Sequence, residues 1–212
     1  VAKFMAQEIN RSGILADYPT IDGVVPFIHG TGCALDDRGE GYEILLRTEW
    51  GYAGNPNLGA ALMVGLGCET FQIGKMKERY GIVEGDTFRT MTIQEIGGTK
   101  KIVEWGVERI KEMLPNVAKA QRETIPASEL TLALQCGGSD GYSGITANPA
   151  LGLAADTLVR HGGTAILSET PEIYGAEHLL TRRAVSREVG DKLIARIKWW
   201  EDYTSRNRGE MN

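Results

Sequence analysis

Apolar positions along the chain follow two kinds of pattern, which predict an alternation of strands and helices. Continuous apolar runs are typical of buried strands, and they occur at residues 22–28, 58–66, 87–93, 130–135 and 164–167. Apolar residues spaced three and four apart predict helices over residues 1–11, 40–52, 70–79, 99–114, 148–161 and 185–203. Pro115 is expected to end the fourth of these helices, because proline lacks the N–H that a helix needs.

This alternation predicts an α/β fold in three layers. Strands that alternate with helices favour a largely parallel sheet with right-handed crossovers and helices on both faces, wound as in Rossmann-like or flavodoxin-like proteins. We expect residues 1–212 to form a single α/β domain. The abrupt start of the first helix indicates a domain taken from a longer protein.

Composition narrows the class of protein. The 212 residues are 42% hydrophobic and 24% charged, which is typical of a globular protein. The net charge of −5 argues against a nucleic-acid partner, and we find no apolar run of the roughly 18 residues that a membrane span needs. Three cysteines without short regular spacing do not suggest a disulfide framework, so we expect a cytoplasmic protein.

The three cysteines stand in similar settings. Cys33, Cys68 and Cys136 each follow an apolar run and lie beside glycine. Because the carboxyl ends of parallel strands share one edge of a sheet, we expect the three thiols to lie there together. Thiolates are soft ligands that bind iron or iron–sulfur clusters, so the pattern predicts an iron centre, either Fe²⁺ or a cluster. The alternative is that each cysteine is a small buried apolar residue.

Acid–base candidates occur near the same strand ends. His29 ends the first apolar run and is a candidate base or iron ligand, or else a turn residue that bonds to backbone. Glu69, Glu169 and Glu172 follow predicted strands and are candidates for proton transfer or cation binding, although loop glutamates are commonly just solvated. His178 is a further candidate catalytic residue.

A glycine-rich segment after the 130–135 strand is the candidate substrate-binding loop. It includes Gly137, Gly138, Ser139 and Asp140, offers backbone N–H groups and side-chain oxygens, and leads into a predicted helix N-terminus. It lacks the lysine of a phosphate loop, and the chain's glycine turns lack the Gly-x-Gly-x-x-Gly pattern of a dinucleotide fold. Arg182 is a candidate clamp for a substrate carboxylate.

Several longer motifs carry a family resemblance. They are HGTGC (29–33), YAGNPN (52–57), VGLGCE (64–69), LQCGGSD (134–140), NPA (148–150) and SETPEIYGAE (168–177). In these motifs the chain resembles the altronate and galactarate dehydratase family, which also holds the large subunit of sulfolactate sulfo-lyase. The resemblance implies an iron-dependent hydro-lyase that converts a sugar acid to a 2-keto-3-deoxy acid. It also implies that this chain is the central domain of a longer enzyme, with a small N-terminal domain or subunit and a C-terminal portion as its partners.

Three alternatives stay open from the sequence. A sulfo-lyase would expel sulfite in place of water at the same site. A non-catalytic binding or scaffold domain would use the cysteines as core residues, and a cysteine-nucleophile enzyme would need a histidine partner that no local signature provides. The sequence leaves the oligomeric state open, a homo-oligomer included.

Overall fold

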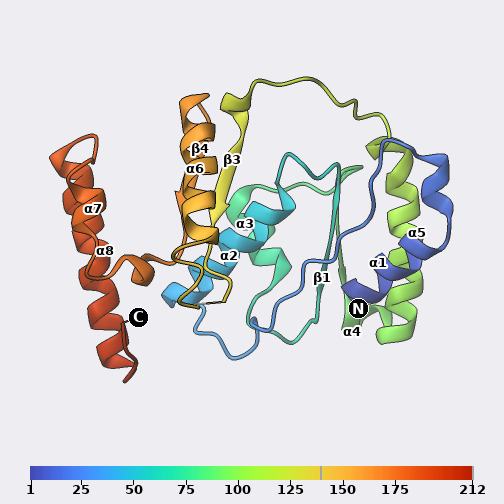
Figure 1. Cartoon of the computed structure of the whole chain (residues 1–212). Helices are drawn as coiled ribbons and strands as arrows, with labels where there is room; N and C mark the ends of the chain where they lie inside the picture. Colours follow the sequence, from blue (N-terminus) through green and yellow to red (C-terminus); the bar gives the residue numbers. More distant parts are fainter. Residues whose placement is uncertain (139, 212) are drawn as a thin grey trace. The chain divides into compact units, whose positions relative to one another are not determined.

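The computed structural model describes residues 1–138 and 140–211, and these divide into two compact units (Figure 1). The first unit is Val1–Glu123 and the second is Thr124–Asn212. The single domain expected from the sequence stays a prediction, and we describe the two units separately. No helix of the described part is both long and apolar enough to cross a membrane.

The first unit is built on two parallel strands with helices on both faces. Strands β1 (Ala61–Gly65) and β2 (Phe88–Thr92) pair in parallel, in a register from Ala61 opposite Phe88 to Gly65 opposite Thr92. The helices are α1 (Ala2–Arg11), α2 (Glu40–Ala53), α3 (Ile73–Tyr80), α4 (Ile93–Ile96) and α5 (Thr99–Val117), with a 3₁₀ turn at Ile14–Asp17.

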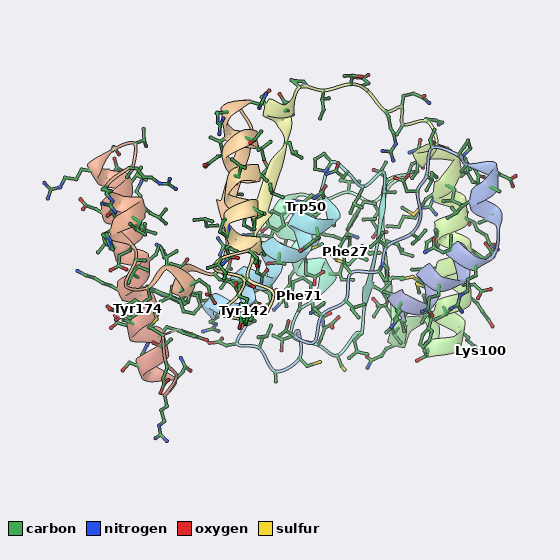
Figure 2. The ribbon with its side chains drawn as sticks, in the orientation of Figure 1. Phe27, Trp50, Phe71, Lys100, Tyr142 and Tyr174 are labelled. Carbon is green, nitrogen blue, oxygen red and sulfur yellow. The ribbon has the colours of Figure 1, made fainter. Side chains whose placement is uncertain are left out.

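Alternation along the two strands creates two apolar cores, because successive strand side chains point to opposite faces. On one face, Phe88 packs with residues of α2 and α3; on the other, Met91 packs with residues of α1 and α5. The first core holds Tyr42, Leu45, Leu46, Phe71, Met76 and Phe88, with Trp50 packed against it (Figure 2). The second core holds Met5, Ile9, Met91, Ile102 and Val107, and α1 and α5 lie side by side over it (Figure 1).

The second unit repeats the strand–helix–strand plan on a smaller scale. Strand β3 (Thr131–Leu134), helix α6 (Ala147–Arg160) and strand β4 (Thr164–Leu167) follow one another, and the strands pair in parallel with Leu134 opposite Leu167. Two further helices follow, α7 (His178–Thr181) and α8 (Arg187–Arg206), with 3₁₀ turns at Ala127–Glu129 and Thr170–Ile173.

The order of elements agrees with the sequence prediction, but the sheet does not. The described residues form two separate two-stranded parallel sheets instead of one large sheet in three layers. The strand predicted over residues 22–28 is also wrong, since this segment forms no strand and has no ladder partner in the described chain. There the side chain of Asn10 satisfies the backbone of Val24, accepting from its N–H at 2.9 Å and donating to its oxygen at 2.9 Å.

Helix α5 differs from its prediction at one end. It continues through Pro115 to Val117, and the N–H of Ala118 bonds to the oxygen of Leu114 at 2.9 Å. A proline in the last turn removes only one helical hydrogen bond. The buried side chains of Met113 and Leu114 hold this turn against the unit, so the helix ends later than the proline indicated.

Candidate active site

The first unit contains a histidine held between a carboxylate and a hydroxyl. Nε2 of His29 lies 3.0 Å from Oε1 of Glu49, and Nδ1 lies 3.2 Å from Oγ1 of Thr31. His29 and Thr31 belong to the turn that precedes Cys33, whereas Glu49 projects from α2. The two ring nitrogens of His29 therefore have different partners, one acidic and one neutral.

Glu49 was missed in the sequence analysis, although the helical pattern carried a signal for it. Counting along α2, Glu49 lies seven residues after Tyr42, four after Leu45 and three after Leu46, and these three side chains are buried. A carboxylate is thus placed on the apolar face of the helix. Burial raises the pKa of Glu49, the neighbouring charge of Glu69 also raises it, and the positive charge of His29 opposes the rise.

Glu69 lies at the carboxyl end of β1, close to His29. Its Oε1 accepts a hydrogen bond from the N–H of Leu66 at 2.8 Å. Gly32, with φ +123°, lies beside both groups: a Cβ placed there would be 3.5 Å from Oε2 of Glu69 and 3.7 Å from Cε1 of His29. Only a residue without a side chain adopts this backbone geometry readily, so Gly32 allows histidine and carboxylate to approach.

A backbone hydrogen bond joins the loops that carry Cys33 and Cys68. The N–H of Phe71 donates to the oxygen of Gly32 at 3.1 Å, joining the loop after β1 to the turn that holds His29. Cys33 and Cys68 are both exposed free thiols within these loops. Since Cys136 belongs to the second unit, the three-thiolate centre stays a prediction.

The second unit brings a thiol and two carboxylates together. Ligand atoms of Cys136, Glu169 and Glu172 all lie within 4.8 Å of one another, and all three residues are exposed. The predicted site residues that follow β3 and β4 are therefore neighbours. Cys136 is a predicted metal ligand, and Glu169 and Glu172 are predicted catalytic residues.

Parallel pairing explains why this group forms. The β3–β4 ladder continues past the strands, with the N–H of Ser168 donating to the oxygen of Leu134 at 2.8 Å. The next residues are thereby held side by side, and the N–H of Cys136 donates to Oε2 of Glu169 at 2.9 Å. Glu169 has φ +58°, a left-handed conformation that is uncommon outside glycine. This turn begins the 3₁₀ segment Thr170–Ile173, on which Glu172 lies.

The glycine-rich loop after Cys136 is shaped by Asp140. Its Oδ1 accepts from the N–H groups of Tyr142 and Ser143, each at 2.9 Å, and its Oδ2 accepts from the Ser143 hydroxyl. The hydrogen bond from the Ser143 side chain is the main reason why the pKa of Asp140 is lowered. Asp140 is thus occupied in forming a turn.

The remaining predicted residues are placed as follows. Gly137 and Gly138 are exposed in the same loop as Asp140. His178 is the first residue of α7 and Arg182 follows its last residue, and both are exposed. Ser139 lies outside the described residues.

Comparison with protein families gives two matches along the chain. Residues 1–118 match the model described as D-galactarate dehydratase/altronate hydrolase, second domain. Residues 127–212 match D-galactarate/altronate dehydratase, C-terminal. The boundary between the matches falls where the structure divides into its two units.

Curated relatives agree with these matches. Altronate dehydratase of Bacillus subtilis (strain 168) is 36% identical over 203 residues, which is 95% of this chain and 39% of the relative. Galactarate dehydratase (L-threo-forming) of Escherichia coli (strain K12) is 39% identical over 173 residues, 79% of this chain and 33% of the relative. The (2R)-sulfolactate sulfo-lyase subunit beta of Chromohalobacter salexigens is 32% identical over 158 residues, 74% of this chain and 39% of the relative. The chain spans between a third and two fifths of the length of these relatives, and it belongs to the galactarate and altronate dehydratase family.

Proposed function

We propose that this chain forms part of an iron-dependent hydro-lyase that dehydrates a sugar acid of the altronate or galactarate type to a 2-keto-3-deoxy acid. The observation that carries the proposal is the convergence of Cys136, Glu169 and Glu172 within 4.8 Å, in a chain whose relatives are named as dehydratases of these acids. The group lies at the carboxyl edge of a parallel sheet, where ligands of α/β proteins commonly bind.

The donor set of this group is compatible with iron. Thiolates suit soft metals, whereas carboxylates suit harder ones. A mixed set of one sulfur and two carboxylates fits Fe²⁺, and Cys33 and Cys68 remain candidate ligands for the same metal or for an iron–sulfur cluster. Iron bound by these residues would supply positive charge that stabilises negative charge developing on substrate oxygen atoms.

The protein's own residues would move the protons. Dehydration breaks the C–H bond next to the carboxylate and the C–O bond of the neighbouring hydroxyl, and the resulting enol becomes the 2-keto acid. A base must accept the carbon-bound proton, and the departing hydroxyl must leave as water. His29, Glu69, Glu169, Glu172 and His178 are the candidates for these transfers. Arg182 would hold the substrate carboxylate through charge-assisted hydrogen bonds.

Elimination of sulfite is the second candidate reaction. It is favoured by the similarity to the sulfolactate sulfo-lyase subunit, which extends over 74% of this chain. The base would perform the same proton abstraction, and the bond that breaks would be C–S in place of C–O. The two candidates therefore differ in the leaving group.

The test uses the intact enzyme that carries this chain, purified without oxygen. Iron and labile sulfide are measured, and altronate, galactarate and sulfolactate are supplied separately while 2-keto-3-deoxy acid and sulfite are assayed. We expect bound iron and a 2-keto-3-deoxy product from a sugar acid. Release of sulfite alone would support the sulfo-lyase, and an iron-free protein without turnover would support a scaffold.

Matched variants connect the reaction with the proposed ligands. Cys136→Ser and Glu169→Gln are expected to lower both iron content and turnover, because each removes a donor. Glu188→Gln is the control, since Glu188 pairs on the surface with Lys192 at 2.7 Å and is 76% exposed. Full iron and turnover in Cys136→Ser would remove this thiol from the site.

A further inference from the structure

We infer that Glu49 is the positioning residue of His29, and that Nδ1 of His29 is the nitrogen that accepts the substrate proton. The inference rests on the proposed function, in which His29 is one of several candidate bases. It assigns a role to Glu49, which lies on α2, outside the motifs in which the chain resembles its family. It also selects one nitrogen of the imidazole ring.

The hydrogen-bond chemistry of the pair determines the assignment. An ionised carboxylate can only accept hydrogen bonds, so the nitrogen 3.0 Å from Oε1 of Glu49 must carry a proton. That nitrogen is Nε2. In a neutral imidazole the other nitrogen has a free lone pair, so Nδ1 becomes the acceptor and the Thr31 hydroxyl, 3.2 Å away, donates to it.

Several supports hold this arrangement in place. Glu49 projects from a helix whose apolar face packs in the first core, and its side chain is only 23% exposed. The side chain of His29 is 39% exposed, so part of it remains open to solvent. The turn that carries it is tied to the loop after β1 by the hydrogen bond from Phe71 to Gly32.

Exposed ion pairs of the same chain provide the contrast. Arg187 and Asp191 have side chains that are 94% and 71% exposed and lie 3.7 Å apart. Such pairs lose side-chain entropy when they form and contribute little to stability. The more buried pair of Glu49 and His29 is instead suited to fixing one orientation of the ring.

The proposed step balances in protons and bonds. The Thr31 hydroxyl turns away, Nδ1 accepts the proton as the substrate C–H bond breaks, and the ring becomes an imidazolium. Glu49 stabilises this positive charge through Nε2–H, as the third group of a catalytic triad does for its histidine. The proton then returns to solvent or to the departing hydroxyl, so no oxidant or reductant is needed.

The direct test is the protonation of the two ring nitrogens. Long-range ¹H–¹⁵N correlation spectra are recorded on the full chain with ¹⁵N-labelled histidine, at mildly alkaline pH. The chain has three histidines, so His161→Gln and His178→Gln assign the signals of His29 by elimination. We expect protonated Nε2 and unprotonated Nδ1. A proton on Nδ1, alone or together with Nε2, would overturn the inference.

Two glutamine variants separate positioning from a general effect on the helix. Glu49→Gln removes the charge at similar size, and we expect its His29 spectrum to become a mixture of tautomers. Glu43→Gln is the matched control, because Glu43 lies on the same helix and pairs with Arg79 on the surface at 3.4 Å. An unchanged His29 spectrum in Glu49→Gln would contradict the role of Glu49. If this variant does not fold, the wild-type spectrum alone decides between the nitrogens.

Turnover of the intact enzyme provides the second measurement. In Glu49→Gln we expect kcat to fall by about 10²-fold or more, the lower end of what a positioned general base contributes, with KM almost unchanged. A kcat equal to that of Glu43→Gln would contradict positioning. The spectrum does not depend on turnover, so an enzyme with the expected spectrum that dehydrates no sugar acid would contradict the proposed function alone.

Discussion

Replacing Glu49 by methionine tests whether this carboxylate is retained at the expense of stability. Glu49 occupies a position on the apolar face of α2, beside the buried Leu45 and Leu46. Burial raises the pKa of its carboxyl group, which means that the folded chain disfavours the charged form. Methionine has a similar length and no charge, so Glu49→Met is expected to stabilise the first unit.

The magnitude follows from the exposure of the side chain. Glu49 is 23% exposed, and burying a methionine fully contributes about 1.5–3 kcal/mol, so burying three quarters of it contributes about 1–2 kcal/mol. Loss of the contact with His29 removes about 0.2–1 kcal/mol, the range measured for exposed pairs. The net gain in stability is then about 0–1.8 kcal/mol. At about 3–5 °C per kcal/mol for a unit of this size, Tm rises by up to about 9 °C.

The stability gained by Glu49→Met should increase from acid to neutral pH. A free glutamate has a pKa near 4.5, and burial raises the pKa of Glu49 above it. The folded chain therefore holds this proton more tightly, and the stability that it contributes is present below pH 4.5 and is lost as pH rises through the raised pKa. The advantage of Glu49→Met is thus small in acid and grows toward neutral pH.

The assay is thermal unfolding followed by circular dichroism and calorimetry across this pH range. Glu43→Met is the control, because Glu43 lies on the same helix with its side chain 47% exposed and should gain less. A variant Glu49→Met that is less stable than the wild type at neutral pH would refute the reasoning. The pair of Glu49 and His29 would then stabilise the fold by more than burial of the charge destabilises it.

Two further predictions concern the loops near the site. Gly32→Ala is expected to destabilise the first unit by about 1–3 kcal/mol, because φ +123° is strained for alanine, and the midpoint of urea unfolding measures this loss. Gly30→Ala is the control, because a Cβ at Gly30 would have no neighbour within 4 Å, and its stability should be nearly that of the wild type. Equal midpoints for the two variants would contradict the strain at Gly32. Hydrogen bonds lower the pKa of Asp140, so the turn it forms should persist below pH 3.8 and open only as pH falls through the lowered pKa. Amide ¹⁵N shifts of Tyr142 and Ser143 report the opening, which should be absent from the acid titration of Asp140→Asn.

The helices and the paired strands could be predicted because they depend on local periodicity. Apolar spacing placed α2, α5, α6 and α8 close to their observed bounds. The grouping of Cys136 with Glu169 also has a local cause, since each residue lies two positions after a strand and the two strands pair in parallel. Parallel neighbours present their carboxyl ends at one edge, so knowledge of the pairing is sufficient to bring these residues together.

At residues 22–28 the apolar pattern of the sequence does not show whether a strand has a partner to pair with. Its apolar run is typical of a strand, yet Pro26 lacks an N–H and no neighbouring strand of the described chain pairs with it. A ladder requires a partner, and the side chain of Asn10 takes the backbone groups of Val24 instead. The same limit applies to the sheet as a whole, because an alternating order of elements does not determine how many strands share one ladder.

Glu49 could not be assigned from sequence for a different reason. The helical pattern of the sequence places Glu49 on the apolar face of α2. Its partner His29, however, belongs to an irregular turn, and no periodic pattern predicts the path of such a turn. The same turn holds Gly32, which has φ +123°, and a Cβ placed there would lie 3.7 Å from Cε1 of His29. Residues joined through irregular backbone are found only when the path of that backbone is known.

In both units, a backbone N–H group donates a hydrogen bond to a glutamate carboxylate that lies just after a strand. In the first unit, Glu69 follows β1 and accepts from the N–H of Leu66 at 2.8 Å; in the second, Glu169 follows β4 and accepts from the N–H of Cys136 at 2.9 Å. A backbone N–H donor restricts the positions that a glutamate side chain can take. Each oxygen keeps further lone pairs for another donor or a cation. Carboxylates fixed in this way differ from solvated loop glutamates, because the strands determine where their charge lies.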